Sequence, residues 1–359
     1  MRYSWECNKC GQKGQQDKLI RFCPRCGNRL EITYNSVNDN SSFDFSQIKD
    51  KAHEQFCETF EFDKLDGFNF SNFIRQMFKW HTWDEIEDYI CQGISTKRPH
   101  ISQVSTAWPA PWLFFYSTVT TILAMIFLYW RASFFGPSIM LPLLIFGIIG
   151  IPFSTLLFFW EMNVTKNISI LWLLRTMLIC GFLSIAINFF LRDFLENPRN
   201  AIWAGPIEET AKCLSMLFFL KNKNFAYKLN GLLIGAAVGA GFAFIESGHY
   251  FFVHGASVIN IRAVCAPFAH VAYSAIAGFG LWCAYKKYGF SFSILKDKKF
   301  LILFFLAVAI HMFWNSDILK TELVIRTAIV AVVEYFVIFY AIQEGLNEIR
   351  DIKCGRISI

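Results

Sequence analysis

The stretch GPIEETAK, residues 205–212, puts two carboxylates and an ammonium group inside an apolar run that is long enough to span a membrane. Charged side chains at membrane depth cost about 2.5–3.5 kcal/mol each on insertion scales, so they normally face the interior of a helix bundle and serve a function. Three later apolar runs carry a matching polar group: Glu246, then His270, then His311 with Asn315. We therefore expect a scaffold of membrane helices that gathers these groups.

The composition predicts an all-α polytopic membrane protein. Of the 359 residues 54% are hydrophobic, 40 are Phe, and the mean hydropathy is +0.36, which excludes an ordinary soluble protein. Residues 1–30 lack the apolar core of a cleavable signal peptide, so we expect the amino terminus to stay in the cytosol. The net charge of +6 forms no basic stripe, so we expect no nucleic-acid partner.

Two Cys-x-x-Cys-Gly motifs near the amino terminus predict a zinc ribbon over residues 1–34. Their cysteines are Cys7, Cys10, Cys23 and Cys26. Four thiolates close the tetrahedron of a structural zinc site and leave no position open for catalysis. A redox dithiol and surface disulfides are the alternatives, but the other seven of the eleven cysteines are scattered, which favours a reducing compartment. We expect the ribbon to serve folding or contact with a cytosolic partner.

The rest of the chain divides by composition into four parts. Residues 35–46 are rich in Asn, Ser and Asp and predict a linker that buries little apolar surface. Residues 47–98 carry aromatic and aliphatic side chains at three-to-four spacing, which predicts a small cytosolic helical region that packs on the membrane domain. Apolar runs fill residues 110–345, and residues 346–359 are expected to form a cytosolic tail.

Eight apolar runs follow Pro99, each near the ~20 residues that cross a bilayer core. They cover residues 112–130, 139–160, 168–191, 200–220, 229–252, 264–285, 300–318 and 324–343. With the amino terminus inside, fourteen Lys and Arg residues fall in inside loops and five in outside loops. This positive-inside bias predicts a multi-pass protein of the cell membrane with both termini cytoplasmic.

The polar groups of four spans share one expected depth. Glu208, Glu246, His270 and His311 lie about six to eight residues from the outer ends of their spans, which is roughly 9–12 Å along a helix. A common site in the outer leaflet explains this coincidence. In span seven, His311 and Asn315 are four residues apart and therefore share one helix face.

Span five carries a stripe of small residues that lets a neighbouring helix approach closely. The stripe consists of Gly231, Gly235 and Gly239. Glu246 lies seven residues beyond Gly239, on nearly the same face of the helix. We therefore expect Glu246 to point into the bundle.

The gathered side chains contain both halves of a hydrolytic site. A carboxylate beside an imidazole in a partly wet cavity can hold and deprotonate a water molecule. A second imidazole and a carboxamide can donate hydrogen bonds to a developing oxyanion. The candidate catalytic residues are Glu208, Glu209, Glu246, His270, His311 and Asn315.

Three other interpretations remain open. In a purely structural one, Glu208 or Glu209 neutralises Lys212 and the histidines make ordinary contacts between helices. In the second, buried Glu and His side chains relay protons or bind ions for transport, or bind a partner without proteolysis. In the third, two carboxylates and two imidazoles hold a catalytic zinc ion with an open position. We favour a site without a catalytic metal.

The order of four short motifs resembles the PrsW family of intramembrane proteases. The motifs are Glu-Glu-x-x-Lys from Glu208, Phe-x-x-x-Glu ending at Glu246, Arg-x-x-x-x-Pro-x-x-His ending at His270 and His-x-x-x-Asn from His311. The resemblance covers about residues 110–345. The family is similar in turn to the CAAX prenyl endopeptidases and the bacteriocin-immunity proteins, a glutamate-dependent clan.

The resemblance implies a role for each motif residue. Glu208 would activate water, Glu209 would pair with Lys212, and His311 with Asn315 would stabilise the oxyanion. Glu246 stands where the prenyl endopeptidases have histidine, so both Glu246 and His270 are candidates for the group beside the base. The implied substrate is a membrane protein or membrane-anchored peptide.

Four further polar residues in or near the apolar runs are expected outside the site. For Arg175 and Glu334 we expect a structural ion pair or an arginine that snorkels to the interface. We place His249 and His254 in the loop beyond span five, with His249 the nearer to the site entrance.

Overall fold

The computed structural model describes most of the chain in ten segments. These are residues 3–6, 13–16, 45–94, 96–135, 141–142, 145–195, 201–220, 225–255, 257–319 and 321–357. The first two are strands β1 (Tyr3–Glu6) and β2 (Lys13–Gln16), which pair antiparallel. The four cysteines of the predicted zinc ribbon lie outside the described residues, so the ribbon stays a prediction.

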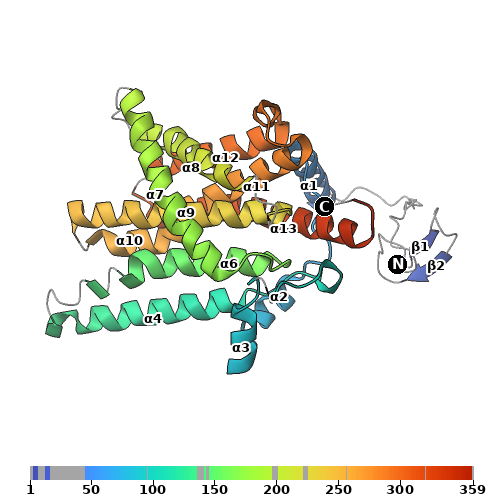
Figure 1. Cartoon of the computed structure of the whole chain (residues 1–359), viewed down its shortest axis with the longest axis horizontal. Helices are drawn as coiled ribbons and strands as arrows, with labels where there is room; N and C mark the ends of the chain where they lie inside the picture. Colours follow the sequence, from blue (N-terminus) through green and yellow to red (C-terminus); the bar gives the residue numbers. More distant parts are fainter. Residues whose placement is uncertain are drawn as a thin grey trace.

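A bundle of helices forms the body of the protein (Figure 1). In chain order its elements are α4 (Trp112–Phe135), η3 (Ile145–Gly150), α6 (Ile151–Met162), α7 (Ile170–Phe194), η4 (Ala201–Trp203), α8 (Ala204–Leu220), α9 (Lys228–His254), α10 (Ser257–Cys265), η5 (Ala266–Phe268), α11 (His270–Tyr288), η6 (Phe292–Lys296), α12 (Lys298–Asn315) and α13 (Leu323–Lys353). The fold class of the bundle is therefore all-α, as predicted.

Six helices in the described part of the chain are long and apolar enough to cross a membrane, which establishes a multi-pass protein. The predicted count of eight is not confirmed. The predicted fourth span corresponds to α8, whose 17 residues are short for a bilayer core. The predicted sixth span, 264–285, is broken: α10 and η5 precede α11, which starts only at His270. Helix α11 is long enough, but its polar residues make it less apolar than the six.

Helix α9 is the central element, and α11 packs along it at backbone distance. The predicted glycine stripe makes this possible. A Cβ atom on Gly235 would collide with the carbonyl oxygen of Ser274, and one on Gly239 with that of His270. The two helices therefore touch main chain to main chain. This contact brings Glu246, farther along α9, beside the first turn of α11, so the predicted inward face of Glu246 is confirmed.

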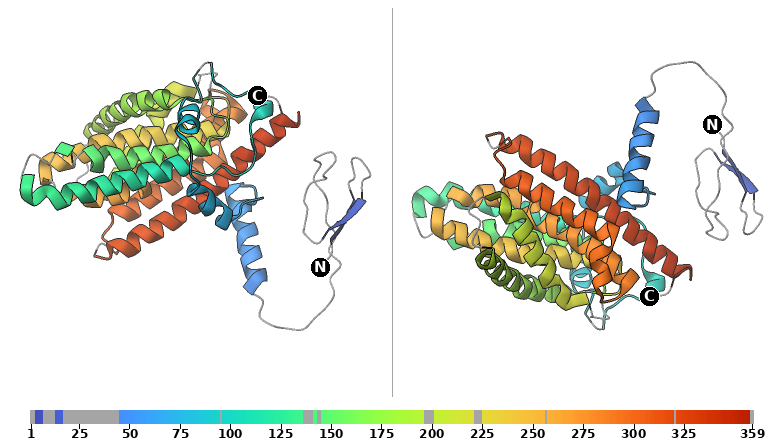
Figure 2. Two further views of the ribbon diagram at one scale, coloured as in Figure 1. Left: turned by 90° about the horizontal axis from the view of Figure 1, so that it is seen from below. Right: turned by 90° about the horizontal axis from the view of Figure 1, so that it is seen from above.

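The region before the bundle is helical, as expected, and packs against it (Figure 2). It contains α1 (Phe45–Phe60), α2 (Phe70–Met77), α3 (Trp83–Ile90) and the short η1 (Ile101–Gln103). Asn69 caps α2, and Thr82 with Glu85 forms a capping box on α3. Aromatic contacts attach the region to the bundle, including His81 stacked on Trp112 with ring centroids 4.1 Å apart.

Candidate active site

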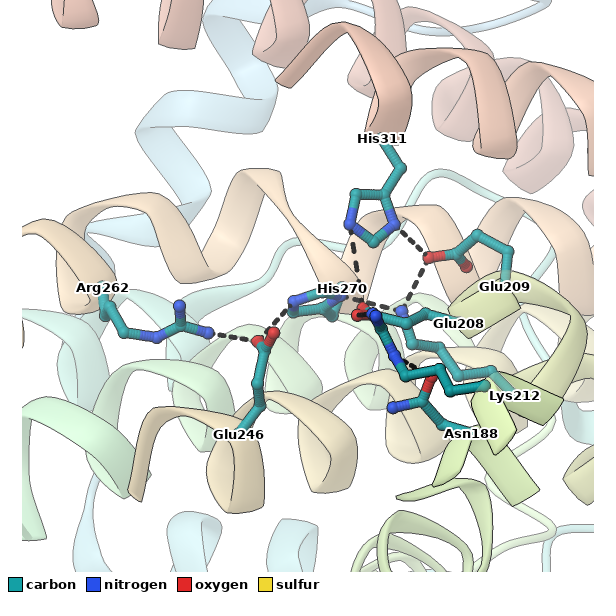
Figure 3. A network of polar contacts seen from close by, with 9 residues as sticks. Asn188, Glu208, Glu209, Lys212, Glu246, Arg262, His270 and His311 are labelled. Carbon is teal, nitrogen blue, oxygen red and sulfur yellow. Dashed lines mark hydrogen bonds and ion pairs between the residues drawn. The ribbon is translucent and has the colours of Figure 1, made fainter. Parts of the chain in front are cut away.

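Four helix ends bring the predicted polar residues together at one end of the bundle (Figure 3). Glu208 begins the second turn of α8, and His270 is the first residue of α11. His311 lies one turn before the end of α12, and Glu246 about two turns before the end of α9. Because neighbouring helices alternate in direction, these ends face one another and the side chains converge.

Glu208 is 4% exposed, and one of its two carboxylate oxygens is hydrogen-bonded. Its Oε1 accepts a hydrogen bond of 3.1 Å from Nη2 of Arg192, in the last turn of α7. Its buried Oε2 has no hydrogen-bond partner in the described part of the chain. The nearest imidazole nitrogen in an ion-pair geometry is Nε2 of His311, 3.8 Å from Oε2. Glu208 therefore keeps one buried acceptor free.

A chain of hydrogen bonds runs behind Glu208 and selects the tautomer of both histidines. Lys212 donates to Oε1 of Glu209 at 2.6 Å and to Nδ1 of His270 at 2.8 Å. Since an ammonium group only donates, Nδ1 accepts and Nε2 of His270 carries the proton, which it donates to Glu246 at 2.8 Å. Nδ1 of His311 lies 2.9 Å from Oε1 of Glu209 and donates to it, which leaves Nε2 as the acceptor in the neutral form of the imidazole.

Each carboxylate of the site has its own cation. Arg192 pairs with Glu208, Lys212 with Glu209, and Arg262 with Glu246. Nε of Arg262 also donates to the Ser247 hydroxyl at 2.7 Å. The Lys212–Glu209 pair is fully buried, and such a pair persists only when geometry and hydrogen bonds offset the cost of desolvation. The three pairs together carry no net charge.

The side chains surround a cavity of about 270 Å³. Five of the six predicted catalytic residues line it: Glu208, Glu246, His270, His311 and Asn315. Glu209 does not line the cavity. It lies behind the site, 1% exposed, and makes the expected contact with Lys212.

Sequence reasoning missed the arginines of the site. Arg192 directly follows the predicted span 168–191 and was one of the five residues counted in outside loops, but it lies on α7, where its Nε also donates to Oδ1 of Asn188 at 3.2 Å. The four-residue spacing of Asn188 and Arg192 at the end of an apolar run was the available signal. Arg262 begins the motif that ends at His270, but the sequence indicated no role for it. In the structure it forms the ion pair with Glu246.

Other polar residues differ from their expected surroundings. His249 and His254 belong to α9 and not to a loop, because the helix continues to His254. Glu334 is fully buried, yet neither of its oxygens has a hydrogen-bond partner within the described ranges, so the expected ion pair is not found. The guanidinium of Arg175 lies 6.0 Å from the Trp172 ring centroid, a contact typical of an arginine at an apolar surface.

The site does not fit a catalytic metal as it is arranged. Glu208, His270 and His311 offer ligand atoms within 4.8 Å of one another. Glu208 Oε2 and His311 Nε2 are open, but both nitrogens of His270 are engaged by Lys212 and Glu246. A catalytic zinc ion takes three protein ligands, and in this group of described residues only Glu208 and His311 have an open ligand atom. A divalent ion would also add two charges to a set that is already neutral.

Comparisons with known proteins place this architecture in a family. A model described as "PrsW family intramembrane metalloprotease" matches residues 151–342, which include every side chain of the site described above. The chain is 27% identical over 175 residues to "Protease PrsW" of Halalkalibacterium halodurans, covering 46% of this chain and 79% of that protein. It is 29% identical over 209 residues to "Protease PrsW" of Clostridioides difficile, covering 52% and 84%. No solved structure matches. The chain therefore belongs to the PrsW family of intramembrane proteases.

Proposed function

We propose that this protein is an endopeptidase that cleaves a peptide bond of a membrane protein, or of a membrane-anchored peptide, with water activated by Glu208. One observation carries the proposal. Oε2 of Glu208 is a buried acceptor without a partner among the described residues, at the wall of a cavity that also contains an acceptor nitrogen of His311. Leaving a buried acceptor unsatisfied costs about 1–3 kcal/mol, so the arrangement suits a bound water.

The chemistry then follows from the positions of the side chains. A water that donates to Glu208 Oε2 and His311 Nε2 presents its oxygen to a carbonyl carbon in the cavity. Glu208 takes the proton as the carbon–oxygen bond forms and returns it to the leaving amine as the carbon–nitrogen bond breaks. Asn315 and Arg192 line the same cavity and carry N–H groups of the kind that stabilise an oxyanion. His311 thus orients water, a different role from the oxyanion contact that the family resemblance implied.

The other residues position these groups. Glu209 holds the His311 tautomer, and Lys212 holds that of His270. His270 and Arg262 together keep Glu246 charged and fixed at the edge of the cavity. A wrong tautomer or a displaced carboxylate would disturb the position of the water. We therefore propose that Glu209, Lys212, His270 and Arg262 act by positioning other groups and not through contact with the substrate.

The direct test is Glu208→Gln in full-length protein reconstituted in vesicles. The amide keeps the size of the side chain but cannot accept a proton, so cleavage of a membrane-protein substrate should fall by roughly 10²-fold or more while the melting temperature is kept. If the purified variant cleaves as fast as the wild type, Glu208 is not the base. A proton- or ion-coupled flux that Glu208→Gln abolishes, with no peptide bond cut by the wild type, would show a transporter instead.

We further propose that zinc is bound only by the amino-terminal ribbon. Metal analysis of the full chain should then give one zinc ion, and a variant with Cys7→Ser and Cys10→Ser should lose it. Activity of that variant should resist chelators, because the hydrolytic site needs no metal. If the cysteine variant retains one zinc ion that His311→Ala removes, the metal-free mechanism is wrong.

The orientation in the membrane is also a proposal. The excess of Lys and Arg in alternate loops favours cytoplasmic termini and a site in the outer leaflet. The orientation can be tested with single cysteines at Ser257 and Ser291, each in a background without other reactive cysteines. Intact cells are labelled with a thiol reagent that does not cross the membrane. We expect Ser257→Cys to react and Ser291→Cys to be protected. The reverse pattern would put the site in the inner leaflet.

A further inference from the structure

A second hollow lies between α7 and α9 and shares part of its lining with the catalytic cavity. This hollow, which we call the α7–α9 cleft, has a volume of about 600 Å³. Arg192, Glu208, Glu246 and Tyr250 line both the cavity and the cleft. A molecule in the cleft would therefore lie against the side chain of Glu208 without crossing a helix.

The cleft follows from the way the two helices cross. A Cβ atom on Gly181 would lie 2.6 Å from the Gly241 backbone, and one on Gly241 would collide with the carbonyl oxygen of Met177. The helices thus touch main chain to main chain at this point, and α7 crosses α9 obliquely (Figure 1). Beyond the crossing they diverge, and the cleft opens between them toward Arg192 and His254.

The lining of the cleft combines an apolar part with polar groups. Ile185 and Phe189 of α7 and Ile245 of α9 supply apolar surface. Asn188, Arg192 and His249 add hydrogen-bonding groups beside Glu208. Hydrocarbon offers no partner to a non-helical backbone, so an extended peptide at membrane depth needs polar groups of this kind. An intact helix, whose backbone is already satisfied, does not.

A larger groove elsewhere on the bundle lacks this connection. This groove, which we call the α4–α13 groove, has a volume of about 850 Å³ and lies among α4, α6 and α13. None of the described residues that line it lines the catalytic cavity. The segment α10–η5 separates the two: Arg262 and Cys265 face the cavity, whereas Ala263 and Pro267 face the groove. The groove can hold a lipid chain or an intact helix, but it gives no path to Glu208.

We propose that the α7–α9 cleft receives one transmembrane segment of the substrate in a locally unwound, extended form and delivers its scissile bond to Glu208. The inference rests on the proposed function, because it assigns the substrate route of that same site. Arg192 stands where cleft and cavity meet, so an entering peptide must pass its guanidinium group.

Photocrosslinking tests the route without catalysis. In full-length Glu208→Gln protein, benzoylphenylalanine replaces Ile185 or Ile245 in the cleft, or Val332 or Ile126 in the α4–α13 groove. The probe is a single-pass model protein with a ~20-residue Leu/Ala span that a Gly-Pro pair interrupts in the half nearest the site. We expect crosslinks from the two cleft positions, severalfold weaker ones from the groove, and weaker ones again with an uninterrupted span. Crosslinks from the groove alone, or crosslinks from the cleft to lipid alone, would overturn the proposal.

Cleavage of the same probe by otherwise wild-type protein gives the second measurement. Ile245→Trp fills the cleft, so cleavage should fall about tenfold or more, since small misplacements of a substrate cost up to 10²-fold. Val332→Trp, on the exposed side of α13, should leave cleavage unchanged, and melting curves should show both variants folded. Equal cleavage in both variants would exclude the route. If the wild type cleaves nothing but the cleft still crosslinks the probe, the proposed hydrolysis fails and the docking site stands.

Discussion

Two clusters of buried charge lie at opposite ends of the same helices. The site cluster gathers Glu208, Glu209 and Lys212 of α8 with Glu246 of α9 and the two histidines. At the other ends of α9, α11, α12 and α13 lies what we call the lysine cluster. Its members are Lys228, Lys286, Lys299, Glu344 and Glu348. Both clusters consist of acid–base pairs, yet they use their acceptors differently.

The difference lies in what faces each carboxylate oxygen. In the lysine cluster, Oε2 of Glu348 accepts from the Lys228 backbone N–H at 2.7 Å, and its Oε1, which has no hydrogen-bond partner in the described part of the chain, lies 2.8 Å from Nζ of Lys286 in an ion pair. Nζ of Lys228 donates to Oε1 of Glu344 at 2.6 Å, and Lys299 occupies Oε2, so both oxygens are engaged. In the site cluster, Oε2 of Glu208, whose side chain lines the cavity, has no hydrogen-bond partner as far as the structure describes the chain. A fully paired carboxylate stabilises a fold, whereas an open acceptor at a cavity is a cost that function can explain. The comparison thus separates a structural cluster from a reactive one.

The largest expected effect on stability comes from Glu344→Gln in the lysine cluster. The amide removes the negative charge between Lys228 and Lys299, and a buried ion left without its partner costs about 3–5 kcal/mol. Chemical unfolding in detergent should show this loss, while the cleavage rate per folded molecule is kept. Glu208→Gln is the matched variant and should show the opposite: normal stability and little cleavage. Equal loss of cleavage in both variants would erase the distinction between the clusters.

Next in size is His311→Ala in the site cluster. The change removes both the Nε2 acceptor beside Glu208 and the partner of Glu209, so cleavage should fall roughly 10²-fold, about 2.7 kcal/mol in the barrier. Lys286→Ala, at the other end of α11, is the control and should retain its cleavage rate. A His311→Ala protein with a normal rate would remove this residue from the mechanism.

The close packing that aligns both clusters can be tested at two glycines of α9. Gly239→Ala forces a methyl group against the His270 carbonyl, which should cost about 1–3 kcal/mol of stability and shift His270 away from Glu246. Gly248→Ala meets nothing within 4 Å and should be neutral or slightly stabilising. Melting curves of the two variants decide. If both behave alike, the α9–α11 contact is looser than the structure indicates.

The gathering of the site was predictable because burial constrains polar residues in apolar runs. Glu208, Glu246 and His311 each interrupt such a run, and a charge there must face the bundle. The glycine stripe likewise predicted which face of α9 meets a neighbour. These features follow from composition and helical period alone, so no long-range information was required.

The pairing inside the site was not predictable, because it depends on how each helix is rotated and where it starts. The predicted span 264–285 placed His270 inside a continuous helix, but the break before it makes it the first residue of α11, which places it between Lys212 and Glu246. Arg192 escaped notice because an arginine at the end of an apolar run usually snorkels to the interface. Here Glu208 and Asn188 hold it instead.

The smallest of these effects should come from Asn315→Ala. A single oxyanion donor contributes at most about 3–4 kcal/mol when it alone holds the charge. Asn315 lines the cavity together with Arg192, so a second donor remains, and we expect a loss of about tenfold, or 1.4 kcal/mol. The loss should appear in kcat and not in KM, because the oxyanion exists only in the transition state. Asn347, on α13 beside the lysine cluster, provides the control. Asn347→Ala also removes a carboxamide and should leave kcat unchanged. A change in KM alone would place Asn315 in substrate binding, and the oxyanion contacts would then rest on Arg192.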